Sequence, residues 1–138
     1  MKKHRYLLDT GPAFDCMFRR RGVYERLREV RLRGARVGIC PPVLGEIIAG
    51  VENSQSRDAT WEVVRRNLSL FVLWPYEKKA AHEYGRIFAD LKRIGRPMQQ
   101  IDIQIAAIAL TMGNTVVVSS DSDLSAVPGL TVENWASP

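Results

Sequence analysis

The segment QQIDIQIAAIAL, residues 99–110, is apolar after its two glutamines except for a single carboxylate at Asp102. Its length and composition predict a largely buried helix over residues 99–112. A charge that is removed from water without a partner is costly. We therefore expect Asp102 either to cap the start of this helix or to face a partner such as a cation.

Around this segment the chain alternates short apolar runs with helical patterns. The expected strands are residues 5–9, 36–40, 70–74, 115–120 and 129–135, the last of them at a sheet edge. The expected helices are residues 22–34, 41–51, 58–68, 77–95 and 99–112. The residues Thr10-Gly11-Pro12 are expected to end the first strand in a turn. This alternation predicts a three-layer α/β/α sandwich with a central, mainly parallel sheet.

The size and composition are those of one globular domain, which we expect to span residues 1–138. Two cysteines, Cys16 and Cys40, are too few for a secreted disulfide framework and favour a cytoplasmic chain. The opening residues reach a Gly-Pro pair too soon for a signal segment. No apolar run approaches the roughly 20 residues of a membrane span, so we expect no membrane partner.

The charge of the chain is basic, with a formal net charge of +5 and a sequence pI near 9.6. Most of the positive charge is arginine, whose planar donors suit phosphate, so nucleic acid is the first partner to consider. Charge alone leaves open a protein that binds none. The arginines chosen as candidate RNA contacts, with solvated surface charge as the alternative, are Arg19, Arg20, Arg21, Arg93 and Arg96.

Carboxylates follow several of the expected strands, where open α/β sheets bind their ligands. Asp9 ends the first strand, Asp121 and Asp123 follow residues 115–120, and Glu46 lies on the helix after the second strand. Each has a simpler alternative. Asp9 also fits a turn, the pair after residue 120 fits a helix cap or a polar loop, and Glu46 fits an exposed helix stripe.

Taken together, these acids and Asp102 are expected to converge on one edge of the sheet. Carboxylates packed together repel and raise one another's pKa, so the cluster is costly unless divalent cations neutralise it. Hard oxygen ligands without histidine or cysteine favour Mg²⁺ or Mn²⁺ over zinc. Carboxylates holding Mg²⁺ beside a basic surface are the arrangement of a nuclease.

The residues that carry a family resemblance occur in a fixed order along nearly the whole chain. They are LLDTGP (7–12), PPVLGEIIAG (41–50), GRPMQQIDIQIAAIAL (95–110) and VVVSSDSDLSAVPGLTVENW (116–135). In this order they resemble the PIN-domain family, and within it the VapC-type toxins of bacterial and archaeal toxin–antitoxin pairs. The stretch from Asp102 to Leu110 is the most diagnostic, together with the closing V-P-G-L and tryptophan.

The resemblance implies an endoribonuclease that depends on Mg²⁺ or Mn²⁺. The family's first acid matches Asp9, and the hydroxyl after it matches Thr10. The second acid matches Glu46 and the third matches Asp102. A homodimer, an RNA substrate and a cognate antitoxin are implied as well.

The fourth acid of the family follows the fourth strand, where this chain departs from the pattern. Ser119 and Ser120 stand where relatives often have threonine, and a leucine replaces phenylalanine at position 124. The resemblance favours Asp121 as the metal ligand, with Asp123 as a support or a second-site ligand. The serines are expected to support the site, and the choice between the two aspartates stays open.

The expected reaction is hydrolysis by a water molecule activated at a metal held by Asp9, Asp102 and Asp121. Glu46 is the candidate base, and the products carry 5′-phosphate and 3′-hydroxyl ends. Three alternatives remain: a PIN nuclease of RNA maturation, a non-catalytic RNA-binding module of the same fold, and a phosphotransfer protein. The third is weak, since a haloacid-dehalogenase site needs Asp-x-Asp where this chain has Asp9-Thr10-Gly11.

Overall fold

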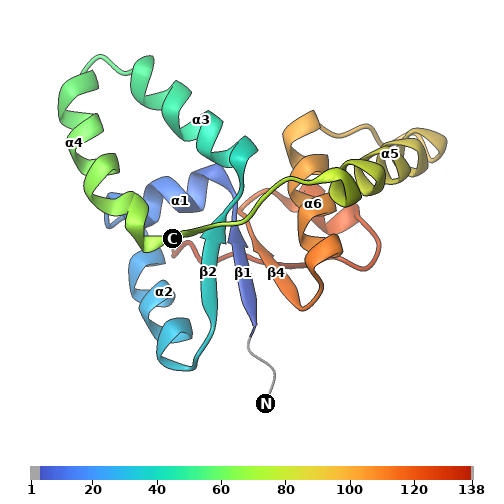
Figure 1. Cartoon of the computed structure of the whole chain (residues 1–138), viewed down its shortest axis with the longest axis horizontal. Helices are drawn as coiled ribbons and strands as arrows, with labels where there is room; N and C mark the ends of the chain where they lie inside the picture. Colours follow the sequence, from blue (N-terminus) through green and yellow to red (C-terminus); the bar gives the residue numbers. More distant parts are fainter. Residues whose placement is uncertain (1–3, 138) are drawn as a thin grey trace.

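The computed structural model describes residues 4–137. Within them one sheet contains the strands β1 (Arg5–Leu8), β2 (Arg36–Ile39), β3 (Val72–Leu73), β4 (Thr115–Val118) and β5 (Thr131–Glu133). Their order is β3-β2-β1-β4-β5, and every neighbouring pair is parallel, as the labelled arrows of Figure 1 show for the centre. The predicted parallel sheet and the edge position of its last strand are confirmed.

Helices cover both faces of the sheet, which confirms the three-layer α/β/α sandwich (Figure 1). One side carries α1 (Thr10–Met17) and α2 (Val23–Leu32), and the other carries α5 (Lys78–Arg93) and α6 (Gln100–Met112). The helices α3 (Pro41–Glu52) and α4 (Arg57–Asn67) form a hairpin that leaves the end of β2 and returns to β3.

The residues expected to form only a turn after β1 instead begin helix α1. Asp9 is the N-cap, and its carboxylate accepts a hydrogen bond from the Thr10 backbone N–H. Pro12 lies in the first helical turn, where a backbone N–H has no partner within the helix. The Gly-Pro pair is therefore a helix start, and the prediction of a turn without a helix was wrong.

Two strands are shorter than expected. Residues 70–74 contribute only Val72–Leu73, because Leu68–Leu70 continue α4 as a short 3₁₀ helix. Residues 129–135 contribute only Thr131–Glu133. A second 3₁₀ helix, Ser122–Ala126, follows β4 and carries the acidic loop.

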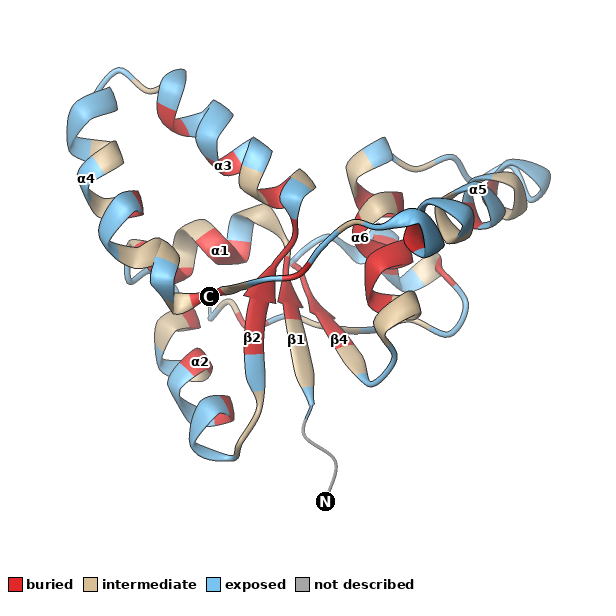
Figure 2. Cartoon of the chain, viewed as in Figure 1, coloured by how far each residue is buried: buried red, intermediate tan, exposed pale blue. Residues whose placement is uncertain are grey.

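The core lies between the sheet and its helices, as the buried ends of the central strands and the buried side of α6 show in Figure 2. Alanines at positions 106, 107 and 109 of α6 are buried and allow close packing against β4 and α5. Cys16 and Cys40 are free thiols in this core. Among residues 4–137, no helix combines the length and the apolar character that crossing a membrane would require.

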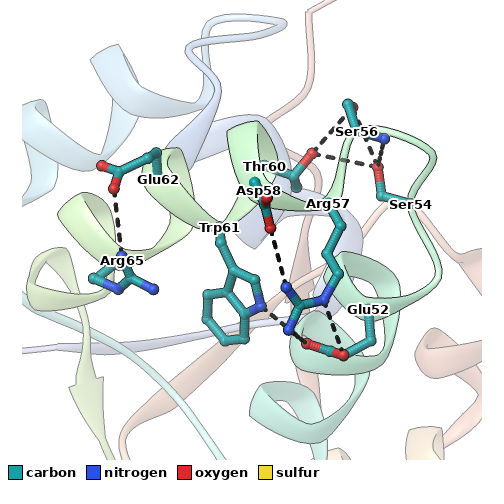
Figure 3. Close-up of polar contacts among 9 residues, drawn as sticks. All are labelled: Glu52, Ser54, Ser56, Arg57, Asp58, Thr60, Trp61, Glu62 and Arg65. Atoms are coloured by element: carbon teal, nitrogen blue, oxygen red, sulfur yellow. Dashed lines mark hydrogen bonds and ion pairs between the residues drawn. The ribbon is translucent and has the colours of Figure 1, made fainter.

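A polar clamp joins the two helices of the α3–α4 hairpin (Figure 3). The Glu52 carboxylate accepts hydrogen bonds from Arg57 Nη2 at 2.8 Å and from Trp61 Nε1 at 2.9 Å. Arg57 also pairs with Asp58. The charged side chains of the clamp are exposed, so they contribute less to stability than to the angle between the helices. The clamp thereby orients α3, which carries Glu46.

The closest backbone approach in the sheet lies at Gly38 of β2. A Cβ atom there would come within 2.5 Å of the Val72 carbonyl oxygen and 2.7 Å of the Trp74 ring. We expect Gly38→Ala to lower the free energy of unfolding by about 1–3 kcal/mol through overpacking. Urea denaturation measures this change.

Gly85 provides the matched control because a Cβ atom added there, in the middle of α5, meets nothing within 4 Å. Gly85→Ala should raise stability by about 0.5–1 kcal/mol, since alanine is the better helix former. A Gly38→Ala protein as stable as wild type would contradict the close approach of β2 and β3.

Candidate active site

Acidic side chains from distant parts of the chain meet at one edge of the sheet. Asp9 follows β1, Glu46 lies on α3 directly after β2, and the segment with Asp121 and Asp123 follows β4. Helix α6 leads into β4 through a short turn, so its first turn, with Asp102, lies where β4 ends (Figure 1). We call these five residues the acidic edge. The expected convergence is therefore observed.

A chain of hydrogen bonds begins on the α3 side of the acidic edge. Thr10 Oγ1 donates to Glu46 Oε1 at 2.6 Å, so the hydroxyl beside the first acid holds the second. Asp9 Oδ1 accepts from the Thr10 N–H at 2.8 Å, and its Oδ2 accepts from Ser119 Oγ at 2.9 Å. Asp9 is thus fixed at both oxygens, between β1 and the end of β4.

The same chain continues through the loop after β4. Ser119 Oγ accepts from the Asp121 backbone N–H at 3.0 Å, and Asp121 Oδ1 accepts from the Asp123 N–H at 2.9 Å. Asp123 Oδ1 in turn accepts from Arg96 Nη2 at 3.4 Å. Ser119 therefore connects two acids, whereas Ser120 is exposed and its side chain bonds to none of the described residues.

Asp102 is the most buried acid of the edge, with 7% of its surface exposed. It is not the helix cap, because Gln99 occupies that position. Its pKa is raised to about 6, first by burial and then by the nearby negative charges, which are those of Asp9, Asp121, Asp123 and Glu46. The charges with the largest effect on the pKa of Asp102 are thus all carboxylates. A bound cation would compensate the negative charge of this buried side chain.

The pKa of Asp9 is also raised, mainly because burial removes its carboxylate from water. The hydrogen bonds from Thr10 and Ser119 lower it in part, while the charges of Glu46 and Asp121 raise it again. The charge of Asp121 is among the main causes that raise the pKa of both Asp9 and Asp102, whereas Asp123 is among those for Asp102. Asp121 is therefore the more central of the two loop acids.

The donor set of the acidic edge fits a hard divalent cation. It offers carboxylate oxygens and hydroxyls, without histidine and with the nearby Cys40 thiol held protonated by a pKa raised to about 11. No three acidic, histidine or cysteine side chains of residues 4–137 already enclose a position for a metal ion.

A groove of about 500 Å³ runs from Glu46 between helices α3 and α6. Its walls are Pro42, Gly45, Glu46, Ala49, Gln99, Gln100, Ile101 and Gln104. Sequence reasoning missed this groove because it depends on how the two helices pack. The only sequence signal was the small residues of α3 facing the polar start of α6.

The candidate RNA-binding arginines divide into two groups. Arg96 reaches the acidic edge through Asp123, and Arg93 lies at the end of α5 in an ion pair with Asp90. Arg19, Arg20 and Arg21 form the loop after α1, at the opposite end of that helix from Asp9. The structure does not bring this second group to the acids.

Local contacts account for two arginines of this loop. The Arg19 guanidinium lies 3.6 Å from the centre of the Tyr24 ring and donates to the Cys16 carbonyl. The Arg20 guanidinium lies 5.0 Å from the centre of the Phe18 ring. These contacts hold the turn between α1 and α2.

The fold and the acidic edge define the class of protein: an α/β/α enzyme fold with clustered carboxylates at the C-terminal ends of parallel strands. The PIN domain family model matches residues 6–130. The chain is 31% identical over 132 residues to the tRNA(fMet)-specific endonuclease VapC of Salmonella typhimurium, covering 95% of this chain and 98% of that protein. It is 28% identical to Ribonuclease VapC2 of Haemophilus influenzae, with 95% and 98% covered.

Solved structures agree with these relatives. The DNA-bound VapBC of Salmonella typhimurium contains a chain with a TM-score of 0.84 and 30% identity, covering 96% of this chain and 99% of that one. VapBC2 of Rickettsia felis, bound to a promoter DNA fragment, has a TM-score of 0.86 at 23% identity and covers 95% and 98%. The chain belongs to the PIN domain family and is a ribonuclease of the VapC type.

The raised pKa of Asp102 predicts a pH-dependent penalty on stability. Its carboxyl is neutral up to about pH 6 in the folded protein, compared with the ordinary value of 3.8. The folded state therefore binds more protons between these values, and the free energy of unfolding falls as the pH rises through them. In EDTA, we expect Asp102→Asn to be about 2–3 kcal/mol more stable than wild type at pH 7.

Denaturant melts between pH 3.5 and 8 measure the effect, and the two curves should converge below pH 4. Glu77→Gln is the control, because that side chain is exposed before α5 and forms no ion pair or hydrogen bond with the described residues, so its loss should change little. An Asp102→Asn protein that is no more stable than wild type at pH 7 would show that Asp102 has a favourable partner within the chain.

Proposed function

We propose that the acidic edge hydrolyses RNA phosphodiester bonds with the help of Mg²⁺ or Mn²⁺. The observation that carries this proposal is the buried Asp102, surrounded by four further carboxylates and without a compensating cation among the charges that act on it most. A cation is the simplest partner for such a cluster. The donor chemistry selects a hard ion, and the family relationship supports a nuclease.

The residues that would hold the ion are Asp9, Asp102 and Asp121, with Asp123 as a support or a second-site ligand. Ser119 Oγ donates to the Asp9 carboxylate and accepts from the Asp121 backbone N–H, and Arg96 donates to the Asp123 carboxylate. When bound, a divalent cation neutralises the carboxylates, activates water and stabilises negative charge on the phosphate.

Glu46 is the proposed general base. Its carboxylate is exposed beside the groove and is held by Thr10, so it faces incoming water and substrate. A water oxygen attacks phosphorus, the released proton goes to Glu46, and the bond from phosphorus to the 3′ oxygen breaks. That oxygen takes a proton from solvent, which leaves 5′-phosphate and 3′-hydroxyl ends. The 2′-hydroxyl is not consumed.

Phosphate contacts near the acids are proposed for Arg96 and Arg93. Both side chains are largely exposed, and their present partners are aspartates. A phosphate can replace a carboxylate as the partner of a guanidinium, because both accept its paired N–H donors. A weaker contact at the far end of α1 is proposed for Arg19, Arg20 and Arg21.

The partners are proposed from the relatives. A VapC with 31% identity is named a tRNA(fMet)-specific endonuclease, so we propose a transfer RNA as the substrate class. The VapBC complexes support a cognate antitoxin for this chain, and a basic antitoxin side chain would neutralise the acidic edge as a cation does. We further propose a homodimer of single domains spanning residues 1–138, acting in the cytoplasm.

Asp9→Asn tests the acidic edge directly. We expect RNA cleavage in Mg²⁺ to fall by at least about 100-fold, because a ligand carboxylate fixed at both oxygens is lost. Sequencing the new RNA 5′ ends measures cleavage, with EDTA as the metal-free reference and Glu77→Gln as the control. Undiminished cleavage by Asp9→Asn would remove Asp9 from the site.

Glu46→Gln separates the base from the metal ligands. The amide keeps an acceptor for Thr10 but cannot take a proton, so kcat should fall by about 10²- to 10⁴-fold while KM stays within about threefold. Thr10→Val should give a smaller loss, because Glu46 keeps its charge but loses its orientation. Steady-state kinetics with wild-type metal dependence would support this role, and an unchanged kcat would exclude it.

A further inference from the structure

The positive charge of the chain is concentrated in its first quarter. Residues 1–36 contain eleven lysines and arginines against four acids, whereas residues 37–138 contain nine against eleven. The net charge of +5 therefore comes entirely from the N-terminal segment. Solubility alone favours positive and negative side chains that are interspersed, and the charges of this chain are instead separated along the sequence.

The fold places part of this charge at the edge opposite the acids. Arg5 begins β1 and Arg36 begins β2, and the two are paired in register on neighbouring strands. Arg31 lies in the last turn of α2, and Arg33 caps its end. We call these four residues the basic edge. In Figure 1 this edge lies where the chain passes from α2 into the start of β2, at the end of the strands opposite the arrowheads.

The basic edge has no acidic partners among the described residues. None of its four arginines forms an ion pair with any residue between positions 4 and 137, whereas Arg26, Arg57 and Arg86 all do. Arg31, Arg33 and Arg36 are exposed, as Figure 2 shows for the start of β2. The Arg5 guanidinium donates to the Gly113 carbonyl, at 3.3 Å.

Favourable interactions within the fold explain the positions of two of the four arginines. A helix C-terminus favours cations, which accounts for Arg31 and Arg33. Arg5 and Arg36 have no such reason, because like charges directly opposite on neighbouring strands destabilise a sheet. Their placement is explained by an anionic partner that binds both.

We propose that the basic edge is a second RNA-binding surface, which holds phosphates of a folded substrate while another part of the same RNA is cut at the acidic edge. Arginine suits this partner because its planar donors bind phosphate in pairs. The four residues of β1 separate the two edges by about 13 Å of strand alone, so a short RNA at the acids does not reach both. This inference rests on the proposed function.

The experiment compares a basic-edge variant with a charge-matched control. The variant is Arg31→Gln, Arg33→Gln and Arg36→Gln. The control removes the same charge from α4 and α5 by Arg65→Gln, Arg66→Gln and Lys79→Gln. Both are tested on whole transfer RNA and on a short oligonucleotide that contains only the cleavage site.

For the basic-edge variant, we expect kcat/KM on whole transfer RNA to fall by roughly tenfold or more, and kcat/KM on the oligonucleotide to stay unchanged. The slope of log kcat/KM against log salt should become shallower by about two, since each lost phosphate contact removes about 0.7. Lysine at the same three positions should restore most of the rate, because a point charge still binds phosphate.

Binding of labelled transfer RNA in EDTA separates this inference from the proposed function, because no cleavage is needed. Weaker binding by the basic-edge variant supports the inference even if the acidic edge proves inactive. Equal losses for the variant and the control, or equal losses on both RNAs, would overturn it. So would an equal loss for duplex DNA, or a loss of antitoxin binding with RNA binding unchanged. Arg36→Gln alone gives the same test if the triple variant does not fold.

Discussion

The mutual repulsion of carboxylates at one sheet edge is the constraint on which the rest of the site depends. A parallel sheet brings the C-terminal ends of its strands together, so acids placed after three strands become neighbours whether or not they attract. The Asp9 carboxylate accepts hydrogen bonds from Thr10 and Ser119, and the Asp121 carboxylate accepts one from the Asp123 backbone N–H. Asp102 has no comparable compensation, because burial and four negative charges act on it in the same direction.

This imbalance links stability to chemistry. A buried acid with a raised pKa lowers the stability of the folded protein at neutral pH, and a well-packed apolar residue would avoid that cost. The surrounding structure supplies the missing stability through the packing of α6, whose buried isoleucines and alanines fill the space between β4 and α5. The acid is thus tolerated because it stands on the helix with the most buried side chains among the described residues.

The sequence predicted the features that depend on periodicity and on strand polarity. Apolar runs located all five strands, and parallel pairing then required Asp9, Glu46 and Asp121 to meet. Helix α1 was missed because Gly11-Pro12 is as typical of a turn as of a helix start, and only the cap at Asp9 decides between them. The partners of Ser119 and Arg96 could not be predicted, since each bond joins segments whose distance depends on loop conformation.

The two edges of the sheet carry charges of opposite sign and hold them in different ways. At the acidic edge, clustered negative charge is held in place by short hydrogen bonds and partial burial, which fits a small cation that must be positioned accurately. At the basic edge, three of the four arginines are exposed and none forms an ion pair within residues 4–137, which fits a large anion with several phosphates. Catalysis requires carboxylates in fixed positions, whereas binding of a large RNA requires accessible positive charge. Because strand direction fixes which residues reach which edge, a single parallel sheet separates the two tasks without an added domain.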